Sequence, residues 1–143
     1  MQYLAYFGTY TRGETGSQGI YAYRLNLDSG KMTEVGLVAK IADPSFLTIH
    51  PNNHYLYSVN ERDGLPGGIS AFAIDPRTGK LQLLNQLSAR GIATCYVSLD
   101  PTARMLAVSN YSSGTVVSFA LRKDGRLSEA VSTIQHKGMR QPH

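Results

Sequence analysis

The amino-acid sequence predicts an all-β protein, a β-propeller built from four-stranded antiparallel blades. A set of landmarks repeats every 46–50 residues along the 143-residue chain. Each repeat holds four short apolar, β-branched or aromatic runs, separated by turns that carry Pro, Gly, Asn and Asp. No window keeps a helical apolar period over ten or more residues. A four-stranded unit that recurs at about 40–50 residues is typical of a propeller blade.

Four landmarks define the repeat. The first two recur 50 residues apart: residues 49–51 (IHP) with 99–101 (LDP), and residues 57–60 (YSVN) with 107–110 (AVSN). The other two recur with steps of 49 and then 46 residues: Gly19, Gly68 and Gly114 each open a strand, and Gly30, Gly79 and Gly125 each close a turn. Four landmarks with one period indicate duplicated structural units.

The strands follow in order from this period. The opening unit predicts strands over 3–9, 20–25 and 32–39, and the middle unit predicts strands over 45–50, 55–60, 69–74 and 81–87. The third unit repeats the middle one, with its first strand over 95–100. We expect the first strand of each unit, close to Ser45–His50 and Cys95–Asp100, to be innermost, and helix content near zero.

The phase of the units predicts one incomplete propeller domain over residues 1–143. Blade 1 (1–42) lacks its inner strand, blades 2 (43–92) and 3 (93–140) have four strands, and residues 141–143 begin blade 4. At about 48 residues per blade, a ring of 4–8 blades needs roughly 190–380 residues. We therefore expect the isolated chain to be inactive and to self-associate through open edges and faces.

Composition and charge exclude several classes of protein. The net charge of +4 carries no cluster of Lys and Arg, which argues against nucleic-acid binding. No apolar run reaches the roughly 18 residues that cross a bilayer, and no secretory signal is visible, so we expect a cytoplasmic protein without a membrane partner. Cys95 is the only cysteine, which excludes an intrachain disulfide and a cysteine-based zinc site.

The repeat also predicts where a ligand site lies. Ser45, Cys95 and His143 share one phase at the start of inner strands, and the ends of the second strands share the same rim. Inward loops on a rigid β scaffold are a common address for ligands. The candidate substrate-binding residues at this rim are Arg12, Arg62, Glu61, Asn60 and Asn110.

Each candidate has two interpretations. His143 is either a general acid or base or an unstructured terminal residue, and Glu61 either orients a base or substrate or is a solvated carboxylate. The guanidinium groups of Arg12 and Arg62 either bind a phosphate or carboxylate or are surface charges. The amides of Asn60 and Asn110 either face the channel or satisfy backbone groups at a turn, and we favour the turn. The Cys95 thiol is either a nucleophile or, as we favour, a small buried hydrophobe.

Other catalytic signals are absent from the sequence. His50, His54 and His136 share no metal-ligand spacing, so we expect no metal site. No Gly-rich phosphate loop and no Gly-x-Ser-x-Gly elbow is found. These absences leave the polar rim as the candidate site.

Several segments resemble the lactonase family of propellers. Residues 6–11 (YFGTYT) followed by Gly19-Ile20-Tyr21 are similar to the family's opening, and residues 44–51, 57–61 and 110–116 are similar to its next two blades. This family includes propeller-type 6-phosphogluconolactonases and fungal carboxymuconate-lactonising enzymes. The resemblance implies a seven-bladed ring, a substrate in the channel mouth and no redox cofactor. Pro142-His143 resembles the start of the family's Pro-His-x-His stretch, which implies that His143 is the active-site histidine.

Three functions follow as hypotheses. The first is a lactone hydrolase of the pentose phosphate pathway that takes a small anionic sugar lactone, 6-phosphogluconolactone, without a cofactor. In it, His143 activates water or stabilises the opening ring, and arginines hold the phosphate. The second is a muconate-type lactonising cycloisomerase, and the third is a non-catalytic binding platform.

Overall fold

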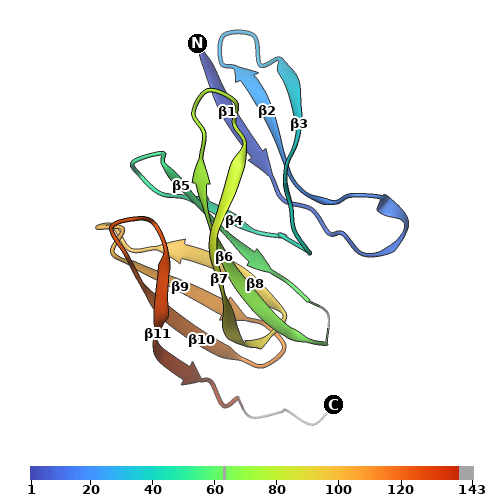
Figure 1. The fold of residues 1–143 in the computed structure, drawn as a ribbon. Helices are drawn as coiled ribbons and strands as arrows, with labels where there is room; N and C mark the ends of the chain where they lie inside the picture. Colours follow the sequence, from blue (N-terminus) through green and yellow to red (C-terminus); the bar gives the residue numbers. More distant parts are fainter. Residues whose placement is uncertain (63, 139–143) are drawn as a thin grey trace.

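The computed structural model describes residues 1–62 and 64–138, which form three antiparallel sheets side by side (Figure 1). The first sheet contains β1 (Gln2–Phe7), β2 (Gly19–Asn26) and β3 (Met32–Lys40). The second sheet contains β4 (Leu47–Ile49), β5 (Tyr55–Asn60), β6 (Pro66–Ile74) and β7 (Leu81–Ile92). The third sheet contains β8 (Thr94–Leu99), β9 (Met105–Asn110), β10 (Thr115–Leu121) and β11 (Leu127–Gln135).

The strand order within each sheet is sequential. The second and third sheets run β4-β5-β6-β7 and β8-β9-β10-β11, and the first runs β1-β2-β3. β4 and β8 therefore lie at sheet edges, and they contact one another where the two sheets converge. The all-β, antiparallel prediction is confirmed, with β4 and β8 in the place expected of inner strands.

Strand ends differ from the predicted ones at several positions. The first strand of the second sheet is Leu47–Ile49 rather than 45–50, because Ser45 closes a tight turn in which its N–H donates to the Asp43 carbonyl at 2.9 Å. β6 begins at Pro66 and β7 continues to Ile92, since these two residues pair across what the glycines had predicted to be a loop. A short 3-10 helix over Gly13–Thr15 was not predicted.

The second sheet is covered on both faces, so nearly every residue of its strand β5 is buried. Leu56 packs with Ile20 and Ala22 of the first sheet. Tyr57 and Val59 face the other way and pack in the core that includes Val97, Leu106, Val108, Val117 and Phe119 of the third sheet. Alternating side chains of β5 thus pack in two separate cores, as expected for stacked sheets.

A tyrosine–glycine contact repeats at both junctions between sheets. The Tyr6 hydroxyl donates to the Gly79 carbonyl at 3.0 Å, and the Tyr57 hydroxyl donates to the Gly125 carbonyl at 3.0 Å. Both glycines have left-handed backbone, with φ of 78° and 83°. Burial raises the pKa of Tyr6 to about 12, and it raises the pKa of Tyr57 as well. Tyr6 of β1 thus binds the β6–β7 turn of the second sheet. Tyr57 of β5 binds the β10–β11 turn of the third sheet in the same way.

These two glycines also leave room for the neighbouring sheet. A Cβ at Gly125 would lie 2.3 Å from the Tyr55 ring, and one at Gly79 would lie 2.9 Å from Leu4. Both the close approach and the positive φ therefore require glycine at this turn position.

Candidate functional site

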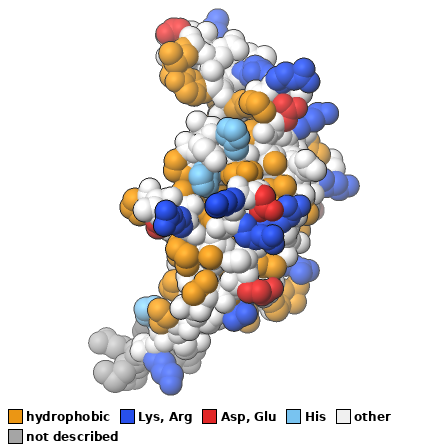
Figure 2. All heavy atoms as spheres, turned by 60° about the vertical axis from the view of Figure 1, so that its left-hand side comes forward, with side chains coloured by type: hydrophobic (Ala, Val, Ile, Leu, Met, Phe, Trp, Pro, Cys, Tyr) orange, Lys and Arg blue, Asp and Glu red, His pale blue; other side chains and the backbone are white. Residues whose placement is uncertain are grey.

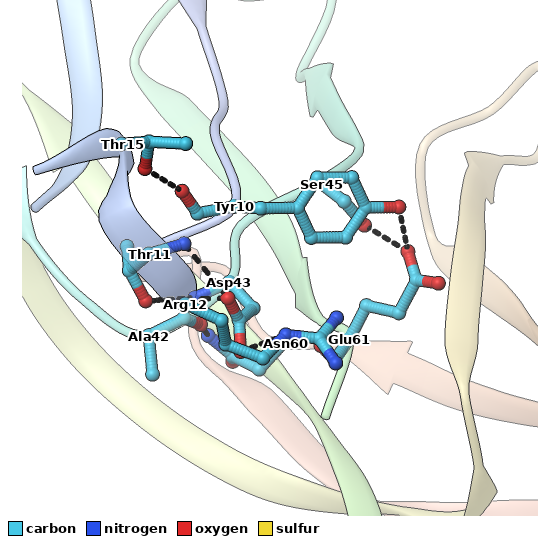
Figure 3. A network of polar contacts seen from close by, with 9 residues as sticks. All are labelled: Tyr10, Thr11, Arg12, Thr15, Ala42, Asp43, Ser45, Asn60 and Glu61. Carbon is cyan, nitrogen blue, oxygen red and sulfur yellow. Dashed lines mark hydrogen bonds and ion pairs between the residues drawn. The ribbon is translucent and has the colours of Figure 1, made fainter. Parts of the chain in front are cut away.

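A cluster of polar side chains joins the first and second sheets at the rim, the end where β1 and β5 finish and β4 begins (Figure 3). We call it the rim cluster; its members are Tyr10, Arg12, Asp43, Ser45 and Glu61. Tyr10 and Arg12 come from the loop after β1, Asp43 and Ser45 from the turn before β4, and Glu61 follows β5. Three separate loops thus converge on one place.

Glu61 is held from two sides. One oxygen of its carboxylate, Oε2, accepts a hydrogen bond from the Tyr10 hydroxyl at 2.9 Å and another from the Ser45 hydroxyl at 2.5 Å. The bond to Glu61 raises the pKa of the Tyr10 phenol, because ionised Tyr10 would face a carboxylate. The carboxylate itself is half-buried, so it is both oriented and reachable from solvent. Such a group can accept a proton or position a bound molecule.

Asp43 organises the other half of the cluster, and sequence reasoning missed it. Its carboxylate accepts from the Thr11 N–H at 2.8 Å and the Thr11 hydroxyl at 3.2 Å, and it pairs with Arg12 Nε at 3.2 Å. The residue is buried and has left-handed backbone, φ 44°. Ala93, 50 residues later, has φ 57°, so the left-handed backbone recurs in the next repeat. The carboxylate does not recur, because alanine occupies the equivalent position. The position beside Pro44 at a predicted rim is the signal that could have identified it.

Arg12 is engaged within the cluster. Besides the ion pair with Asp43, its NH2 group donates to the Glu61 carbonyl at 3.2 Å, and its guanidinium carbon lies 5.3 Å from the centre of the Tyr10 ring. The side chain is still 39% exposed. Arg12 therefore braces the rim and presents part of its positive charge to solvent.

Asn60 and Asn110 are buried, and their amides bond to neighbouring strands. The Asn60 amide donates to the Ala42 carbonyl at 2.7 Å and accepts from Ser70 and Gln86 at 2.7 and 2.9 Å. The Asn110 amide donates to the Ala89 carbonyl at 2.9 Å and accepts from the Thr94 hydroxyl at 2.5 Å. These bonds correspond to the turn interpretation of both residues.

The remaining candidates lie apart from the rim cluster. Arg62 is exposed and lines a shallow pocket of about 260 Å³ with Asn60, Gln86 and Ser88. Cys95 is half-buried, with its thiol 3.8 Å from the Ser109 carbonyl. His143 lies outside the described residues.

An aromatic pair lies beside the rim, where β4 and β8 begin. The rings of Phe46 and Tyr96, which follow Ser45 and Cys95, have centroids 4.7 Å apart. Both are partly exposed, at 37% and 48%. The contact shows that the starts of the two inner strands lie side by side, as their shared phase predicts.

The surface around the site is mixed in character. Figure 2 shows Lys and Arg side chains along the length of one face, mixed with acidic and hydrophobic ones. Within residues 1–62 and 64–138, no three His, Cys, Asp or Glu side chains gather in an arrangement that could hold a metal ion. Over the same residues, no helix has the length and apolarity to cross a bilayer.

Known proteins resemble this chain closely in sequence. A 6-phosphogluconolactonase of Bacillus subtilis (strain 168) is 38% identical over 142 residues, which is 99% of this chain and 40% of that protein. A 6-phosphogluconolactonase of Formosa agariphila is 33% identical over 125 residues, 87% of this chain and 35% of that protein. The chain thus spans well under half the length of these curated relatives.

Solved structures agree. A protein of Bacteroides fragilis described as a candidate 6-phosphogluconolactonase has a TM-score of 0.88 and 34% identity, covering 96% of this chain and 37% of that one. The periplasmic gluconolactonase of Pseudomonas aeruginosa has a TM-score of 0.84 and 33% identity, covering 94% and 39%. The family described as "Lactonase, 7-bladed beta-propeller" matches residues 4–143. By its repeat, its sheets and these matches, the chain belongs to the lactonase family of seven-bladed β-propellers.

Proposed function

We propose that this chain forms part of a lactone hydrolase that converts 6-phosphogluconolactone to 6-phosphogluconate in the pentose phosphate pathway. The observation that carries the proposal is the 38% identity with the Bacillus subtilis enzyme of that name over 99% of the chain. The rim cluster supports it, because an oriented carboxylate beside a partly exposed guanidinium suits an anionic, hydrolysable substrate.

The residues divide into acting and supporting groups in this proposal. His143 supplies acid–base help to the attacking water or to the opening ring. Glu61 orients His143 or the lactone, and the cationic groups of Arg12 and Arg62 attract the phosphate. Asn60 and Asn110 hold the strand ends that carry the rim.

The test uses the seven-bladed protein that contains this chain, with 6-phosphogluconolactone and unphosphorylated gluconolactone as substrates. We expect kcat/KM to be higher for the phosphorylated lactone, because the rim arginines favour an anion. Turnover of carboxymuconate in place of either lactone would support the cycloisomerase instead. Failure with all three substrates would favour a non-catalytic platform.

Variants of the same protein test the individual roles. His143→Ala should lower lactone turnover at least ~10²-fold, the scale of lost acid–base help. Glu61→Gln should lower kcat/KM by about 10²-fold, because the amide cannot hold the same two donors with a negative charge. Glu14→Gln, on the exposed 3-10 turn, is the matched control and should leave turnover unchanged. Normal turnover in Glu61→Gln would show that the rim cluster takes no part in the reaction.

The proposal includes a cytoplasmic location, which we infer from the proposed sugar-phosphate substrate. Cell fractionation with an antibody against the chain checks it. Recovery from the periplasm would instead match the compartment named for the Pseudomonas aeruginosa relative.

A further inference from the structure

The first sheet has one covered face and one open face. Its covered face packs on the second sheet through Ile20 and Ala22. Its open face carries Phe7, Tyr21, Tyr23 and Met32, which line a largely apolar hollow of about 530 Å³. Figure 1 shows the sheet at one end of the molecule.

The turn beside this open face has the same build as the turn that receives Tyr6 in the second sheet. In the second sheet, the Gly79 N–H donates to the Asp75 carbonyl at 2.8 Å, and Asp75 Oδ1 accepts from two further N–H groups. In the first sheet, the Gly30 N–H donates to the Asn26 carbonyl at 2.8 Å, and Asn26 Oδ1 again accepts from two N–H groups. The φ angles of Gly30 and Gly79 are 70° and 78°. The two turns therefore present their glycine carbonyls alike.

The difference lies in what covers each turn. A Cβ built at Gly79 or Gly125 meets the preceding sheet within 3 Å, whereas one built at Gly30 meets nothing within 4 Å. Gly30 thus has the left-handed backbone of the two receiving glycines without the neighbour that makes glycine necessary there. The turn is preformed for a contact that the described residues do not supply.

We propose that the open face of the first sheet receives a further sheet of the same repeat, and that a second-strand tyrosine of that sheet donates its hydroxyl to the Gly30 carbonyl. The proposal extends an interface seen twice in this molecule, at Tyr6–Gly79 and Tyr57–Gly125. In a seven-bladed propeller each blade packs against another, so a further blade can cover the open face of the first sheet. The two junctions in this structure indicate which groups make the contact: a tyrosine hydroxyl and a glycine carbonyl.

A second copy of this chain cannot supply the same contact through its third sheet. If the third sheet of a copy packed there, the residue in the phase of Tyr57 would be Ala107, which has no hydroxyl. The occupant we infer is therefore a different, tyrosine-bearing blade that closes the ring.

The decisive experiment measures thermal unfolding of the seven-bladed protein with Gly30→Ala, compared with Gly16→Ala. Gly16 has φ 69° and nothing within 4 Å of its Cβ position, so it matches Gly30 in backbone strain and in open space within this chain. If a sheet covers Gly30, the added methyl collides with it. We expect Gly30→Ala to lower the midpoint at least twice as far as Gly16→Ala, or to prevent folding where Gly16→Ala folds. Equal shifts would overturn the proposal.

Two further measurements test the occupant. In a crystal structure of the ring, we expect a tyrosine hydroxyl about 3 Å from the Gly30 carbonyl oxygen, as at Gly79 and Gly125. Any other side chain there would refute the tyrosine assignment. Light scattering of the 143-residue chain should give the same mass for wild type and Gly30→Ala; dissociation caused by Gly30→Ala would show that a second copy occupies the face.

Discussion

The hydroxyl of Tyr6 links the first sheet to the second and is partly buried. Burial raises its pKa to about 12, from an ordinary value near 10. Since the folded state holds this proton more tightly, the contribution is complete below pH 10 and is lost as the pH rises through 12. The contact therefore favours folding across the neutral range and weakens only in strong alkali.

The first prediction concerns this tyrosine. Tyr6→Phe should lower the free energy of unfolding at pH 8 by about 0.5–1.5 kcal/mol, the net worth of a hydrogen bond. It should also reduce the loss of stability between pH 10 and 12. Urea unfolding at pH 8 and pH 11 measures both effects, with Tyr3→Phe, an exposed tyrosine, as the control. Identical pH dependence in wild type and Tyr6→Phe would contradict the assignment.

The second prediction concerns Asp43. Asp43→Asn keeps the size and tolerates the left-handed backbone, but it removes the charge that pairs with Arg12. We expect a loss of about 1–3 kcal/mol in unfolding free energy, because charged hydrogen bonds in a buried site are broken. Asp28→Asn, at an exposed ion pair with the amino terminus, should change stability by less than about 0.5 kcal/mol. Equal effects of both substitutions would show that Asp43 is not a structural centre of the rim.

The sequence predicted single residues only where the repeat carries their chemistry. Ser45 and Glu61 were expected at one rim because the start of a first strand and the loop after the second strand lie at the same end of a blade, and the structure joins them by a hydrogen bond. Asp43 was not expected, because the equivalent position of the next repeat is Ala93 and the repeat therefore does not predict a charged residue there. The partner of Arg12 could not be predicted either, because long side chains reach across sheets in ways that spacing does not encode.

β7 and β9 approach one another closely at Gly91. A Cβ built at Gly91 would lie 2.3 Å from the Asn110 amide nitrogen, which holds the end of β9 to the Ala89 carbonyl. The glycine here provides space for the neighbouring amide. Packing at this junction thus depends on the absence of one methyl group.

The third prediction follows from this junction. Gly91→Ala should destabilise the chain by about 1–3 kcal/mol, the usual cost of overpacking, by displacing the Asn110 amide. Gly138→Ala, where nothing lies within 4 Å, is the control and should be nearly neutral. Thermal or urea unfolding compares the two. A stable Gly91→Ala protein would mean that β7 and β9 can separate without cost.

Strand existence was easier to predict than strand ends. β5 matches its predicted range of 55–60, because both its ends carry turn residues and all its interior is apolar or small. β6 starts at Pro66, ahead of the predicted Ile69, because glycines that mark a loop in sequence can still pair when a neighbouring strand is long enough. The ends of strands are decided by pairing partners, which lie outside the local sequence.

The whole molecule presents unpaired surfaces at both ends of its row of sheets. The first sheet has an open apolar face, and on the third sheet Val131 and Ile134 of β11 are 61% and 57% exposed. Exposed apolar faces and unpaired strand edges are templates for association. These features distinguish the isolated chain from a closed ring.

The fourth prediction concerns the isolated 143-residue chain. We expect its mass by light scattering to rise with concentration, and we expect no turnover of 6-phosphogluconolactone, because an open ring neither excludes water nor surrounds a substrate. Val131→Lys should reduce the association by placing a charge on the third sheet. A concentration-independent monomer with measurable turnover would show that a closed ring is unnecessary.

The paired contacts between the first and second sheets have a mechanical consequence. Tyr6 is bonded to Gly79 at one end of the junction, while Arg12 is paired with Asp43 at the other. Rotation of one sheet away from the other therefore has to break at least one of these two contacts, whichever end it opens from. The relative orientation of the first two sheets is thus fixed from both ends of their junction.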